Sequence, residues 1–126
     1  MKTYQKTILL LVLIMVAVVG WGNATVFGQT ASQKNAVRAA KNYLNVIPFS
    51  YNGLIDQLEF DGFTTEQAVY GANNCGADWN KQAVRAAKNY LNVIPFSYNG
   101  LIDQLEFDGF TTEQAVYAAK QSGLTP

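Results

Sequence analysis

Residues 36–70 read AVRAAKNYLNVIPFSYNGLIDQLEFDGFTTEQAVY, and residues 83–117 repeat this stretch letter for letter, 47 positions later. Unrelated sequences that share a fold do not converge on 35 identical residues, so the chain contains a duplication. Residues 71–82 connect the two copies, and they differ from residues 118–126, which follow the second copy. The duplication predicts two tandem structural units of the same fold.

Each copy carries the signals of three short helices. Pro48 ends the first helix, and Ser50 can cap the second. Asp61-Gly62 is a helix-ending turn, and Thr64 with Gln67 forms a capping box for the third helix. No stretch alternates as a strand does. The sequence therefore predicts an all-α fold of two tandem three-helix, helix-turn-helix-like repeats, placed after a hydrophobic N-terminal signal or anchor helix.

Helical spacing also predicts which apolar residues are buried. In the first copy they are Ala36, Ala39, Ala40, Tyr43, Leu44 and Ile47 in the first helix, Tyr51, Leu54, Ile55 and Leu58 in the second, and Ala68, Val69 and Ala72 in the third, with Phe49 and Phe63 closing the two ends of the core. The expected cap of the first helix is Ser32 or Asn35 in copy one and Asp78 in copy two.

The predicted repeats span residues 32–75 and 78–123, and Asn73–Ala77 is expected to be a loop between them. A unit of this size is near the lower limit for independent stability, so two copies gain from a shared interface. We expect a modest interface that includes Trp79. The alternative, in which Trp79 is a plain core residue of the second copy, is equally open.

Residues 1–30 have the pattern of an export segment. Lys2 and Lys6 precede twelve uninterrupted apolar residues, Ile8–Val19, which are too short to cross the ~30 Å hydrocarbon core as a helix. The pattern predicts a cleaved signal peptide or an uncleaved N-terminal membrane anchor. In both cases the remainder of the chain is exported, either held at the cell surface or secreted.

The composition leaves little room for catalysis. The 126 residues include no histidine, one cysteine and equal numbers of basic and acidic residues, nine of each. The commonest general base and metal ligand is therefore absent, and a single thiol cannot build a metal cage. We expect no enzyme activity, no metal and no cofactor. Cys75 lies in the linker and is expected to be structural or incidental.

Charge argues against nucleic acid as a partner. The second helix of a helix-turn-helix reads the DNA groove, but here residues 65–71 carry Glu66 and no lysine or arginine. The basic residues Arg38 and Lys41 lie on the first helix instead. A phosphate backbone would meet carboxylates at the presumed reading edge.

The acidic residues of the second and third helices define the predicted partner-binding residues. They are Asp56, Glu59, Asp61 and Glu66, with the duplicates Asp103, Glu106, Asp108 and Glu113. An acidic surface shown twice suits a basic protein partner and adds avidity. The aromatic residues Tyr51, Phe60 and Tyr70, with Tyr98, Phe107 and Tyr117, are the candidate anchors inside this charged rim. The chain itself is expected to be a monomer.

The run A-x-x-Y-L-x-x-x-x-F-S-x-x-x-L-x-x-Q-L-x-x-x-G-F-T-x-x-Q-A-x-Y, at residues 40–70 and 87–117, resembles the Ltp-like repeat, as does the stretch Asn74–Trp79. The family is that of host cell surface-exposed lipoproteins. The resemblance implies a surface protein of Gram-positive bacteria, often encoded by prophages. It also implies a role in superinfection exclusion, in which the protein engages the phage tape-measure protein and stops DNA entry.

One position departs from the lipoprotein pattern. Trp21 follows Val18-Val19-Gly20, where a lipid-bearing cysteine would stand, so the sequence predicts export without acylation. The alternative to the phage-related function is a general extracellular or wall-associated interaction module with a host partner. Both are binding functions without catalysis.

Overall fold

The computed structural model describes residues 28–126. Residues 32–126 form one compact unit, which contains both repeats. Within the described residues, no helix has the length and apolar character needed to cross a membrane. The predicted signal or anchor, and Trp21 with it, lies outside the described residues apart from Gly28–Thr30.

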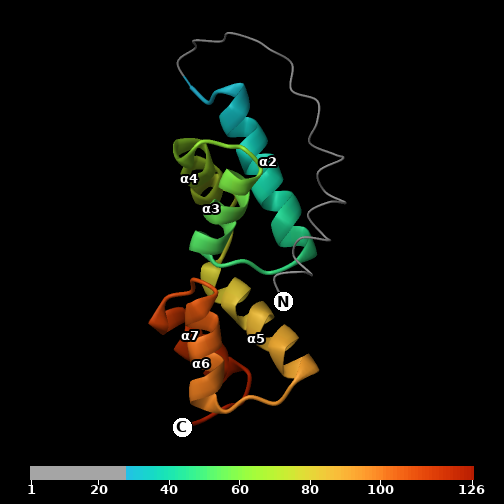
Figure 1. Ribbon diagram of the computed structural model, residues 1–126, viewed down its shortest axis with the longest axis vertical. Coiled ribbons are helices and arrows are strands. Elements are labelled where there is room, and N and C mark those ends of the chain that lie inside the picture. Colours follow the sequence, from blue (N-terminus) through green and yellow to red (C-terminus); the bar gives the residue numbers. More distant parts are fainter. Residues whose placement is uncertain (1–27) are drawn as a thin grey trace. The chain divides into compact units, whose positions relative to one another are not determined.

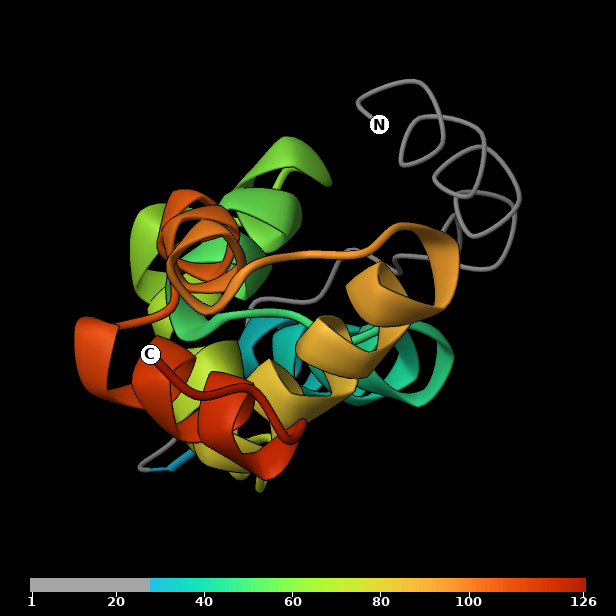
Figure 2. The ribbon, with the colours of Figure 1, turned by 90° about the horizontal axis from the view of Figure 1, so that it is seen from below.

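Six helices and no strands make up the described part of the chain, which confirms the all-α fold. They are α2 (Ala31–Val46), α3 (Tyr51–Phe60) and α4 (Thr65–Asn74) in the first repeat, and α5 (Trp79–Val93), α6 (Tyr98–Phe107) and α7 (Thr112–Gln121) in the second. Each repeat consists of a long helix, a short extended connection and two short helices joined by a tight turn (Figures 1 and 2).

Local capping signals define most of these helix ends. Ser50 is the N-cap of α3, and its side chain accepts a hydrogen bond from Gly53 N. The capping box of Thr64 and Gln67 is complete at the start of α4. Asp78 caps α5, as predicted. Gly62 has φ +98°, a conformation that suits glycine because any Cβ would be strained there.

The predicted boundaries are wrong at two places. Helix α2 begins at Ala31, so Ser32 and Asn35 lie inside it and neither is its cap. Helix α4 continues through Asn74, so the loop between the repeats is shorter than expected. Asn74 extends the helix by donating from its side-chain amide to Tyr70 O at 2.8 Å, which satisfies one of the last carbonyls.

Ile47 was also expected on the buried face of the first helix, but it lies beyond the helix end and is only half-buried. Its duplicate Ile94 is 47% exposed. The physical reason is the following proline, which forces the preceding residue into an extended conformation and turns its side chain off the helical face.

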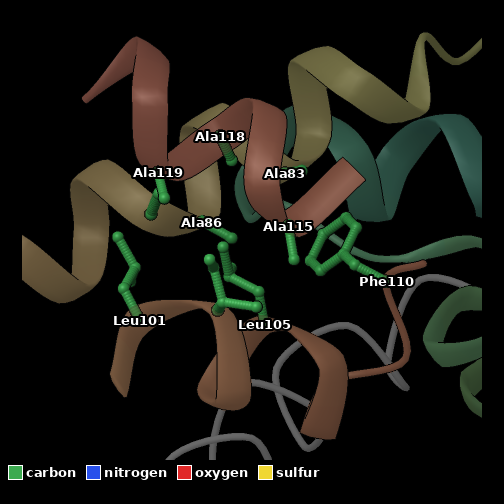
Figure 3. Close-up of a cluster of buried hydrophobic side chains, with 10 residues drawn as sticks. Ala83, Ala86, Leu101, Leu105, Phe110, Ala115, Ala118 and Ala119 are labelled. Carbon is green, nitrogen blue, oxygen red and sulfur yellow. The ribbon is translucent and has the colours of Figure 1, made fainter. Parts of the chain in front are cut away.

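The core of the second repeat is built from leucines against alanines. Leu101 and Leu105 of α6 point toward Ala86 of α5 and Ala115 and Ala119 of α7, and all but Ala86 are fully buried (Figure 3). Small residues on α5 and α7 let these helices approach closely, and the leucines fill the space that remains. Phe110, from the turn before α7, is 5% exposed and lies at one side of the cluster.

The first repeat uses the same residues, with Leu54 and Leu58 fully buried. It differs where α4 packs on α2. A Cβ at Gly71 would lie 2.9 Å from the carbonyl oxygen of Ala36, whereas the corresponding residue of the second repeat is Ala118. The two helices of the first repeat therefore meet closely enough to need glycine at this point.

The two repeats share an interface, as expected. The rings of Tyr51 and Trp79 meet edge to face with centroids 5.5 Å apart, so Trp79 contacts the other repeat. Arg85 Nη1 donates to Leu44 O at 2.8 Å and thereby satisfies a carbonyl in the last turn of α2. Ser50 Oγ donates to Asp108 O at 2.5 Å. Polar contacts to backbone atoms and one aromatic pair therefore join the repeats.

Candidate partner-binding site

Six of the eight predicted carboxylates are exposed. Asp56 and Glu59 lie on α3, and Glu66 lies in the first turn of α4. Their duplicates Asp103, Glu106 and Glu113 occupy the same places on α6 and α7. Residues Asp56 and Glu59 are three apart in a helix, so their side chains lie on one face.

The same face of α3 carries an exposed aromatic ring. Phe60 follows Asp56 by four residues and is 68% exposed, and its duplicate Phe107 on α6 is 80% exposed. We call the set Asp56, Glu59 and Phe60, with its duplicate Asp103, Glu106 and Phe107, the acidic–aromatic face. Each repeat therefore presents one apolar ring beside two carboxylates, an arrangement in which the ring can anchor a partner and the charges can orient it.

Asp61 and Asp108 have a different environment, because each is half-buried and hydrogen-bonded within its own repeat. Tyr43 Oη donates to Asp61 Oδ2 at 2.6 Å, and Gln57 Nε2 donates to Asp61 Oδ1 at 3.3 Å. Tyr90 and Gln104 hold Asp108 in the same way. These bonds join the long first helix of each repeat to the end of its second helix, 18 residues along the chain.

Burial perturbs the acids and phenols of these networks. Loss of hydration raises the pKa of Asp61 and of Asp108 above the ordinary value, although the hydrogen bonds from tyrosine and glutamine oppose the shift. Burial also raises the pKa of Tyr43 and Tyr90 well above 10.0, and the neighbouring carboxylate adds to the shift because it accepts a hydrogen bond from the phenol and repels a phenolate. Both phenols therefore stay protonated far into the alkaline range.

This shift predicts a stability loss at high pH. A group whose pKa is raised by folding contributes stability that is complete below its unfolded pKa, here about 10, and that is lost as the pH rises toward the folded pKa. Phenolate absorbance of the native chain should show a component that ionises late, together with unfolding. The double variant Tyr43→Phe, Tyr90→Phe should lack this component. If the late-ionising component of the phenolate absorbance were still present in the variant, the hydrogen-bond networks of Tyr43 and Tyr90 would be contradicted.

Not all predicted aromatic anchors are available. Tyr51 is occupied at the repeat interface by its contact with Trp79, and its hydroxyl donates to Asn73 Oδ1 at 2.9 Å. Tyr117 is 44% exposed, whereas Tyr70 is half-buried. Two apolar side chains outside the predicted anchors are also exposed, Val46 at 59% and Val93 at 79%. Both valines are the last residues of a long helix, and each helix ends there because a proline, Pro48 or Pro95, follows two residues later.

The described residues contain no cluster of three or more histidine, cysteine, aspartate or glutamate side chains that could hold a metal ion. Cys75 is buried at the end of α4, and its thiol donates to Ala72 O at 3.3 Å. The corresponding residue of the second repeat is Ser122, whose hydroxyl donates to Ala118 O at 2.8 Å. A serine thus fills in one repeat the place that the cysteine fills in the other.

The family model described as host cell surface-exposed lipoprotein matches residues 31–75 and 78–121, which correspond to the two repeats. The chain belongs to this family. Its description places family members at the cell surface, and thus this chain among exported proteins. No curated protein sequence matches the chain.

A solved structure of the family has the same fold. It is that of Ltp, a superinfection exclusion protein from the Streptococcus thermophilus temperate phage TP-J34. The match has a TM-score of 0.70 at 36% identity and covers 74% of this chain and 97% of that chain. The family likeness therefore extends from the sequence of the single repeats to the three-dimensional arrangement of nearly the whole relative.

Proposed function

We propose that this protein is a non-catalytic superinfection-exclusion protein of the cell surface, which binds a protein of an incoming phage and blocks the entry of its DNA. The observation that carries the proposal is the likeness to the phage TP-J34 protein, at 36% identity over 97% of that chain. The absence of histidine from the sequence supports a binding role rather than acid–base catalysis.

The partner that suits the acidic–aromatic face is a basic protein segment, such as part of a phage tape-measure protein, and neither a nucleic acid nor a cofactor. Carboxylates at the rim attract and orient lysine and arginine side chains, while the exposed ring of Phe60 or Phe107 supplies apolar contact. Glu66 and Glu113 add acidic charge on the neighbouring helix of each repeat. A partner long enough to meet both repeats gains avidity.

The charges of this face give the sharpest test. In the variant Asp56→Lys, Glu59→Lys, Asp103→Lys, Glu106→Lys, all four residues are exposed, so the fold should persist while the face becomes basic. Plaque counts of sensitive phages on cells making the natural chain should be at least tenfold below those on cells making the variant. The variant leaves Asp61 and Asp108 unchanged, because the networks of the two repeats need them.

The matched control reverses charge elsewhere. Lys41 and Lys88 are exposed on the first helix of each repeat, and Lys41→Glu with Lys88→Glu should leave protection intact. Binding of the phage protein should also weaken as salt rises, since screening acts over ~8–10 Å. Equal plaque counts with and without the natural chain, across the tailed phages of the host, would refute phage exclusion. Retention of a host surface protein in that case would favour the general interaction module.

A further inference from the structure

Identical residues of the two repeats differ in burial at one end of the second helix. Ser50, the N-cap of α3, is 2% exposed, whereas its duplicate Ser97, the N-cap of α6, is exposed. The local sequence and the capping geometry are the same at both positions. The difference arises because the Asp108–Gly109 turn of the second repeat covers Ser50, while nothing in the described chain occupies the same position over Ser97.

The covered contact consists of two small surfaces. The turn surface is Asp108–Gly109 and the receiving surface is Ser50–Gly53. Ser50 Oγ donates to Asp108 O at 2.5 Å, and Asn52 Nδ2 lies 3.5 Å from Gly109 O. The fit is close, since a Cβ at Gly109 would lie 2.7 Å from Ser50 Oγ and 3.3 Å from Asn52 Cβ. Glycine is therefore required at the tip of the turn by its neighbours as well as by its φ of +96°.

Among the described residues, one copy of the turn surface and one copy of the receiving surface have nothing packed on them. A Cβ at Gly62, the duplicate of Gly109, would meet nothing within 4 Å, so the turn surface of the first repeat is open. A Cβ at Gly100 would meet only Ser97 and Phe96 of its own segment, and Asn99 is exposed, so the receiving surface of the second repeat is open as well. These surfaces have the same sequences as the two that are joined within the chain.

We propose that the chain associates head to tail with a second copy of itself, the Asp61–Gly62 turn of one molecule seating on Ser97–Gly100 of the next. The contact would repeat the one between the two repeats of a single chain. Because the two surfaces differ from each other, the contact is heterologous, and each added molecule again presents one open surface of each kind. The Asp61 side chain does not enter this contact without hydrogen-bond partners, since it accepts from Tyr43 and Gln57 within its own repeat.

The association between chains is weaker than the contact within one. Trp79, which packs on Tyr51 within the chain, corresponds to Ser32 in the first repeat, so the contact between molecules lacks the aromatic pair. It also lacks the covalent connection, which within a chain supplies a high effective concentration. Arg38, the duplicate of Arg85, is exposed and can donate to the end of α5 as Arg85 does to the end of α2. The chain is therefore a monomer when dilute and associates when concentrated.

Site-specific photocrosslinking of the full chain in a non-denaturing detergent tests this contact. A small diazirine amino acid at position 99 should give products of two and more chains, whose yield rises with concentration and which map to the peptide that contains Gly62. The same probe at position 52 should give a product within one chain, to the peptide that contains Gly109, at every concentration. A probe at the exposed Lys120 measures background from chains that share a detergent micelle.

Two variants decide the geometry. Gly62→Asn should reduce the position-99 products to background, because the added side chain would collide with Ser97. Ser32→Trp should supply the missing aromatic partner for Tyr98. The chain concentration at which the yield of position-99 products is half-maximal should then fall about tenfold. Products at or below the Lys120 background, products that survive Gly62→Asn, or a half-maximal concentration unmoved by Ser32→Trp would each overturn the proposal. The outcome is independent of phage exclusion, which is measured by plaque counts.

Discussion

Leu105→Ala is expected to unfold the second repeat or to leave it barely stable. The side chain is fully buried between α5 and α7, where its neighbours are mostly alanines that cannot rearrange to fill the space (Figure 3). Removal of a buried leucine side chain costs about 2–5 kcal/mol, which is a large part of the stability of so small a helical unit. Thermal or urea unfolding followed by circular dichroism measures the loss.

Phe107→Ala is the control for this prediction. Phe107 lies on the same helix, two residues beyond Leu105, and is 80% exposed, so its removal should change the free energy of unfolding by less than about 0.5 kcal/mol. The larger side chain thus has the smaller effect. A similar loss in the two variants would show that α6 does not present Leu105 to the core. Although it stays folded, the Phe107→Ala variant should bind the proposed phage protein more weakly, because the ring of Phe107 belongs to the acidic–aromatic face.

Gly109→Ala should destabilise the chain more than Gly62→Ala does, although the two residues have the same sequence neighbours and nearly the same φ, +96° and +98°. Both substitutions cost about 1–2 kcal/mol for the left-handed backbone. Only the Cβ at position 109 meets another residue, lying 2.7 Å from Ser50 Oγ. Displacement of Ser50 removes its bond to Asp108 O, which adds about 0.5–1.5 kcal/mol.

The difference between these two variants isolates the contact of the turn with Ser50, because the backbone strain cancels. Urea unfolding of both proteins under the same conditions gives the comparison. Gly109→Ala should also separate the unfolding of the two repeats, which the intact interface couples. Equal losses of stability would mean that the contact of the Asp108–Gly109 turn with Ser50 contributes nothing, and would remove the structural basis for association between chains.

Most local structure of this protein could be predicted from its sequence, because it depends on residues a few positions apart. Ser50 and Thr64 cap the helices that follow them, and Gly62 ends the helix before it, since each of these interactions spans no more than a turn. The duplication made the prediction stronger, because the same signals occur twice. The errors lie at ends without such a signal, as at Asn74, where a side-chain bond extends the helix.

The candidate site was predictable only in part. The acidic residues and Phe60 are visible in the sequence, but their surroundings are not. Its acidic side chain places Asp61 beside Glu59 in a prediction from sequence, but Tyr43, whose hydroxyl donates to Asp61, lies 18 residues earlier. Helical spacing leaves Phe60 off the buried face, and its ring is exposed. The contact that removes Tyr51 from the candidate anchors was hidden, because its partner Trp79 belongs to the other repeat.

The sequence by itself determined that this protein has two all-α repeats, and it determined the helices, caps and turns within each. It could not determine which of two identical serines is buried, because Ser50 and Ser97 have identical neighbours along the chain for many residues. Only the tertiary structure decides this, by placing the Asp108–Gly109 turn over Ser50. Such a contact joins residues 58 positions apart, and it depends on how two complete repeats pack rather than on any local preference.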